Sequence, residues 1–228
     1  MPNNLKVMLE AGTKGNKVVA VCPDWPGLER AGKTEEAALV KLEPYLPRYA
    51  KVAARAGLER EFTAQKPWDI TERYLGTGST EFWGVSFAPA PSEFTLPSVQ
   101  EWERRLRLLQ AAWAEFDEVS GRVSAELRRG PRGGGRMRDE IIRHTRLAEE
   151  DMCSKVGVQF KLSELETPQG LAAYRDRFVE ALRRHHREGT VSVGRTWTLP
   201  YLLRHTAYHV LDHAWEMEDK DLTSSVTD

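Results

Sequence analysis

The chain has 228 residues, of which 40% are hydrophobic and 29% are charged, and its formal net charge is −1. This composition is typical of a globular protein with a hydrophobic core, and the length is sufficient for two domains. The near-zero charge excludes a general attraction to nucleic acid or anionic membranes, and no apolar run approaches the roughly 20 residues of a membrane-spanning helix.

The cysteines and the N-terminal residues indicate the cellular compartment of the protein. Cys22 and Cys153 lie far apart in the chain, and two such thiols do not form a disulfide framework. The first ten residues lack the basic and then apolar pattern of a secretory signal. We therefore expect a reduced, cytoplasmic protein that binds neither membranes nor nucleic acid.

The first 60 residues have the pattern of two strands and a helix. Residues 5–9 alternate weakly, and residues 16–22 contain a run of valines and alanine that is typical of a strand. Thr34 is placed to cap a helix that extends through Leu42, and the prolines that follow interrupt it. This part is expected to form a small α/β module.

Residues 61–96 have a mixed pattern. Residues 69–75 and 81–87 are each predicted to form a strand, with glycines between them. The prolines within residues 88–91 favour extended backbone, so this stretch is predicted to be a linker.

The pattern becomes helical after Pro97. A stripe of mainly apolar residues at steps of three and four runs from Trp102 to Leu127. Three more helices are predicted, one over about residues 136–156, one that begins at Thr167-Pro168 and ends before Gly189, and one from about residue 198 to 220. Four helices of this length predict an antiparallel four-helix bundle.

Histidines are concentrated on the last predicted helix. His205, His209 and His213 follow at steps of four, and residues at this spacing lie one above the other on a helix face. His144 lies on the apolar stripe of the second predicted helix, so a third imidazole from a facing helix can reach the same point. Imidazole is a good ligand for zinc, nickel, copper and iron. Spacing alone leaves all four histidines as candidate ligands.

The segment from Tyr208 to Asp219, together with Arg143-His144-Thr145, resembles the DinB/YfiT-like superfamily. The resemblance covers about residues 97–220. It implies a four-helix bundle with a divalent metal held by His144, His209 and His213, zinc or nickel being expected, and it makes His205 the second choice as a ligand. It also implies a homodimer and a small-molecule substrate, with a low-molecular-weight thiol as a further cofactor. The usual glutamine-containing end of the family motif is replaced here by Ala214-Trp215-Glu216.

The N-terminal part resembles a second family. Val21 to Gly27, followed by Gly32 to Ala37, is similar to the HicB-like fold over about residues 3–50. The expected fold class is therefore α+β, with a HicB-like module and linker in residues 1–96 and a DinB-like bundle with a metal site in residues 97–228.

Charged residues near the histidines are candidates for further roles. By helical spacing, Asp151 and Glu216 can each act as a general base or orient a metal ligand. The segment from Arg128 to Arg136 precedes the helix that carries His144, and Arg132 and Arg136 within it are candidates for binding an anionic substrate.

Two classes of function remain open from the sequence. The first is a metal-dependent transferase, isomerase or hydrolase that acts on a small molecule, with thiol-dependent chemistry as one form of it. The alternative is a non-catalytic binding or regulatory protein that uses the HicB-like module.

Overall fold

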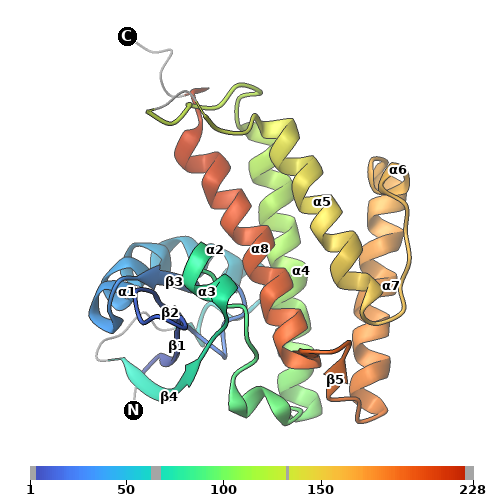
Figure 1. Cartoon of the computed structure of the whole chain (residues 1–228). Helices are drawn as coiled ribbons and strands as arrows, with labels where there is room; N and C mark the ends of the chain where they lie inside the picture. Colours follow the sequence, from blue (N-terminus) through green and yellow to red (C-terminus); the bar gives the residue numbers. More distant parts are fainter. Residues whose placement is uncertain (1–3, 63–67, 132–133, 224–228) are drawn as a thin grey trace.

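The computed structural model describes residues 4–62, 68–131 and 134–223 of the chain. The protein is α+β, with a small mixed sheet and short helices in its first part and long helices in its second part (Figure 1). The elements of the first part are β1 (Lys6–Ala11), β2 (Val18–Val21), β3 (Glu29–Gly32), α1 (Glu35–Leu42), the 3₁₀ turn η1 (Glu43–Tyr45), α2 (Leu46–Arg55), β4 (Asp69–Leu75), α3 (Gly78–Trp83) and the 3₁₀ turn η2 (Pro91–Phe94). The elements of the second part are α4 (Val99–Arg122), α5 (Arg138–Ser154), α6 (Leu162–Leu165), α7 (Pro168–Arg187), β5 (Ser192–Val193), β6 (Trp197–Thr198) and α8 (Leu199–Lys220). No helix in the described part of the chain is both long and apolar enough to cross a membrane.

The four-stranded sheet has the order β3-β2-β1-β4. Strand β2 pairs antiparallel with both of its neighbours, whereas β4 pairs parallel to β1 and has a register irregularity beside Val7 and Met8. One face of the sheet contributes Val7 and Leu9 to the main hydrophobic core, and the other face forms a smaller cluster around Met8 and Ala90.

Local signals predicted several elements correctly. Strands β1, β2 and β4 are confirmed, and so is α1, in which the Thr34 side chain accepts a hydrogen bond from the Ala37 N–H at 3.1 Å. Thr167 and Thr198 cap α7 and α8 in the same way. Each of these signals depends on neighbouring residues alone, which is why the sequence reveals it.

Other expectations for the first part were wrong. The strand predicted over residues 81–87 is absent, because Thr77 caps the short helix α3 and Gly84 ends it in the left-handed conformation (φ 66°). Strand β3 was missed, since its four residues have little apolar character and depend on pairing with β2. Helix α2 was missed because its two neighbouring prolines indicated a break, whereas Pro47 lies in the first turn of a new helix.

The long helices differ from the predicted antiparallel order. Consecutive helices α5 and α7 run in the same direction, and α6 lies in the connection between them (Figure 1). Helices α4 and α8 also run in the same direction (Figure 1). Their C-terminal ends lie close together, since the Ser124 N–H just after α4 donates a hydrogen bond to the Asp221 carboxylate just after α8, at 2.9 Å. Helix α4 ends at Arg122, so the predicted extension of its stripe to Leu127 was wrong.

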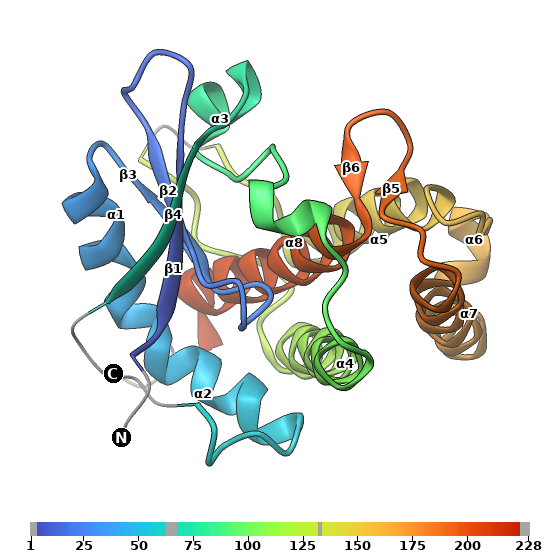
Figure 2. The same cartoon turned by 90° about the horizontal axis from the view of Figure 1, so that it is seen from below.

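The two parts of the chain share one hydrophobic core. The main cluster of buried residues includes side chains of β1, β2, α1 and α2 together with side chains of α4, α5, α7 and α8. Figure 2 shows α8 passing between the sheet and the other long helices. Gly27 lies against α8 with φ +94°, and a side-chain carbon there would lie 2.7 Å from Leu211 Cδ1. This close approach requires a glycine at the turn that follows β2.

A buried ionic network also joins the two parts. Arg204 of α8 donates hydrogen bonds to Glu29 of β3 at 2.9 Å and to both carboxylate oxygens of Glu93 of η2 at 2.8 and 3.0 Å. The three side chains are 1–5% exposed. Burial raises the pKa of Glu29 to about 7, although the Arg204 charge opposes this shift. Arg204 is therefore the cation on which these buried carboxylates depend.

Replacement of Arg204 tests this dependence. We expect Arg204→Met to lower the free energy of unfolding by about 3–5 kcal/mol, because it leaves buried carboxylates without a counter-ion. Urea denaturation followed by circular dichroism measures the change. The control Arg187→Met removes an exposed ion pair with Glu180 and should cost less than about 1 kcal/mol. Equal effects of the two substitutions would contradict the account.

Candidate metal centre

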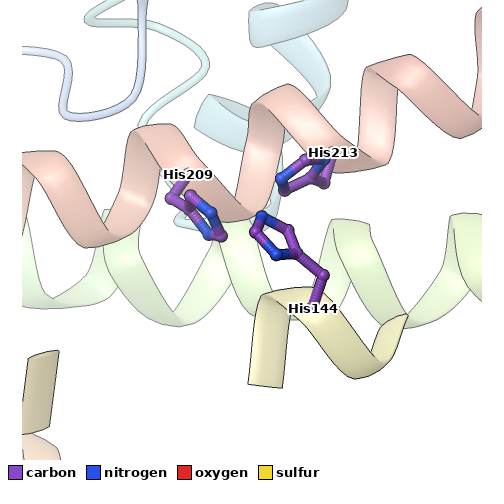
Figure 3. Close-up of side chains that lie close together, drawn as sticks. All are labelled: His144, His209 and His213. Atoms are coloured by element: carbon purple, nitrogen blue, oxygen red, sulfur yellow. The ribbon is translucent and has the colours of Figure 1, made fainter. Parts of the chain in front are cut away.

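Three imidazoles meet where α5 packs against α8. His209 and His213 lie one turn apart on α8, and His144 projects towards them from α5 (Figure 3). The ring centroids are 4.6 Å apart for His209 and His213, 4.9 Å for His144 and His213, and 5.2 Å for His144 and His209. One nitrogen from each ring lies within 4.8 Å of the others, so a single ion is within reach of all three after small side-chain rotations.

The start of α8 and the buried side of α5 determine where the three histidines lie. Thr198 starts α8 by accepting the Tyr201 N–H, and the helical repeat then places His209 and His213 on the same face. On α5, the buried residues Ile141, Thr145 and Met152 fix the side that faces the core, and His144 lies at its edge. His213 is buried, whereas His144 and His209 are partly exposed. The cluster is therefore accessible at His144 and His209, whereas His213 lies in the core.

The surroundings of His144 and His209 favour the form of imidazole that binds metal. Burial, followed by the positive charges of neighbouring histidines and Arg136, lowers the pKa of His144 and lowers that of His209 further. Neutral imidazoles have a free lone pair, which is the form that coordinates metal. His144 and His209 therefore remain available as ligands at neutral pH.

The polar atoms of the cluster fit a cation. His209 Nδ1 is buried and has no hydrogen-bond partner among the described residues. The cluster consists of three imidazoles with no carboxylate among its donor groups, and a buried lone pair in this position is satisfied by a hydrogen-bond donor or a cation. The donor set of three nitrogens suits zinc or nickel and leaves a coordination position open.

His205, the second candidate ligand, lies outside this cluster. Its ring is packed against Phe87, Trp197 and Tyr201, with centroid distances of 5.1–5.5 Å. Its Nδ1 is 3.4 Å from the Tyr201 hydroxyl. His205 is one helical turn from His209, just as His209 is one turn from His213. The aromatic side chains around His205 nevertheless enclose its ring and separate it from the cluster.

The two candidate carboxylates have different environments. Asp151 is exposed and pairs with Lys155 at 3.1 Å, while the next two residues, Met152 and Cys153, are buried. Glu216 lies beside the cluster, where its carboxylate accepts a hydrogen bond from His213 Nδ1 at 2.8 Å. This hydrogen bond, with that of Lys220, lowers the pKa of Glu216 to about 2.

Of the two arginines predicted to bind an anion, the structure describes one. Arg132 lies outside the described residues. Arg136 is exposed, and its charge reaches both His144 and His209. A positive charge is therefore available near the accessible side of the cluster.

The sequence interpretation missed two features around these helices. Lys220 forms an ion pair with Glu216 at 2.5 Å, and the glutamate–lysine spacing of four residues is the signal that predicts it. The second feature is His186 near the end of α7, which stacks on Trp102 and whose Nε2 is 2.8 Å from the Pro97 carbonyl oxygen. That contact joins distant segments, and helical spacing does not predict it.

Comparison of the chain with protein-family models, curated proteins and solved structures found no match.

The buried ring of His205 gives a pH-dependent prediction. Burial and the Arg204 charge lower the pKa of His205 to about 3, whereas the unfolded chain takes up a proton below about pH 6.5. The contribution of His205 to stability is therefore complete above pH 6.5 and is lost as the pH falls. We expect the difference in free energy of unfolding between the wild type and His205→Gln to decrease by about 2 kcal/mol from pH 7.5 to pH 5.0. Urea titrations at both pH values measure it, and a constant difference would contradict the assignment.

Proposed function

We propose that the protein binds one divalent metal ion, zinc or nickel, through His144, His209 and His213. The observation that carries this proposal is the convergence of three imidazoles from two helices on one point. The low pKa values of His144 and His209 and the unpartnered Nδ1 of His209 support it.

We further propose that the long helices form a four-helix bundle of the DinB-like type and that the protein is a metal-dependent enzyme. Three protein ligands leave a position open for water or substrate, which is characteristic of catalytic rather than structural metal sites. A metal held there would lower the pKa of a bound water or thiol. This supports a transferase, isomerase or hydrolase acting on a small molecule, with a low-molecular-weight thiol as a possible co-substrate.

The described residues supply the surroundings for such a substrate. The partly exposed face of His144 provides access, and the nearby charge of Arg136 favours a substrate that carries a carboxylate or phosphate. On the opposite side, the buried core beneath α8 excludes water from His213.

Metal content tests the site directly. The untagged protein, exposed to zinc or nickel and freed of excess ion, should retain one equivalent by elemental analysis. His144→Ala and His209→Ala should each retain far less, because they remove one of three ligands. His185→Ala is the matched control, since this histidine lies on α7 outside the cluster. Substoichiometric metal in the wild type, or equal retention in all variants, would contradict the proposal.

Turnover then separates an enzyme from a binding protein. The metal-loaded wild type should convert at least one compound from a panel of thiol adducts and small esters, and His209→Ala should not. Stoichiometric metal without any turnover would instead favour the non-catalytic alternative.

A further inference from the structure

Each carboxylate oxygen of Glu216 accepts a hydrogen bond from another side chain of α8. Its Oε2 accepts the hydrogen bond from His213 Nδ1 at 2.8 Å, and its Oε1 accepts one from Lys220 Nζ at 2.5 Å. The spacings of three and four residues place all three side chains along one face of the last two turns of α8. Glu216 and Lys220 are 26% and 29% exposed, so this chain of contacts is partly shielded from water.

The hydrogen bond determines which nitrogen of His213 is available. An ionised carboxylate only accepts, so Nδ1 of the neutral imidazole carries the proton and Nε2 has the free lone pair. Among the described residues, His144 and His209 have no carboxylate partner of this kind. His213 is therefore the one ring of the cluster whose tautomer and orientation are fixed before any ion arrives.

We propose that Glu216 and Lys220 are positioning residues that fix His213 Nε2 as a metal ligand, an inference that rests on the proposed metal site. Glu216 orients the ring, and Lys220 holds the carboxylate in the conformation that accepts from Nδ1. Glu216 contacts His213 at Nδ1, the ring nitrogen that is not the proposed ligand atom, so its assigned role is to orient the ring. Groups that hold a histidine ligand in this way commonly change metal affinity by 10- to 100-fold.

The tautomer can be measured without metal. In the metal-free protein at pH 8, where imidazole is neutral, ¹⁵N-edited NMR of the histidine side chains should show His213 protonated at Nδ1. Glu216→Ala should give a mixture of tautomers at His213 while circular dichroism stays unchanged. A mixed tautomer in the wild type, or an unchanged single tautomer in Glu216→Ala, would overturn the proposal.

Metal affinity provides the second readout. We expect Glu216→Ala to weaken zinc binding about 10- to 100-fold and Lys220→Met to weaken it about two- to tenfold, the effect of one hydrogen bond. Lys220→Arg should restore affinity, since the guanidinium also donates to a carboxylate. Lys41→Met is the control, because this exposed lysine also lies in the last turn of a helix. Unchanged zinc affinity in Glu216→Ala would overturn the proposal and leave the metal site intact.

The two readouts separate the inference from the proposed function. If the wild type shows the fixed tautomer but binds no zinc, the metal site is refuted and the positioning of His213 by Glu216 stands. If zinc binds and Lys220→Met matches the Lys41→Met control, the role of Lys220 is refuted.

Discussion

The burial of α8 on almost every side is the constraint on which the rest of the structure depends. Sixteen of its 22 residues are buried, so this helix has no continuous solvent face. One side packs on the sheet through Gly27 and Arg204, and another packs on α4 and α5. A helix held in this way cannot rotate or slide without opening the cores of both parts of the chain.

The burial of α8 determines the geometry of the candidate metal centre. His209 and His213 are fixed by the position of α8, whereas His144 comes from α5, whose face is partly exposed. The first part of the chain therefore affects the candidate site without supplying a candidate ligand, because its contacts with Arg204 and Leu211 set where α8 lies. Metal affinity and the stability of this part are expected to be linked through α8.

The sequence predicted the parts of this arrangement that depend on local spacing. Steps of four on α8 and the apolar stripe of α5 marked four candidate histidines, three of which the structure brings together, and threonine caps marked the starts of three helices. Spacing did not separate His205 from its neighbours, because Trp197 of β6 and Phe87 from a distant segment enclose it. The parallel direction of α5 and α7 likewise depends on tertiary packing and on α6 in the connection.

Anomalous X-ray diffraction from crystals of the zinc-loaded protein, recorded on both sides of the zinc absorption edge, is the most direct test of the central claim. The account predicts one strong anomalous peak per chain, bonded to a nitrogen of His144 and of His209 and to Nε2 of His213 at about 2.1 Å. A peak bonded elsewhere on the protein, or no peak between these three rings, would contradict it.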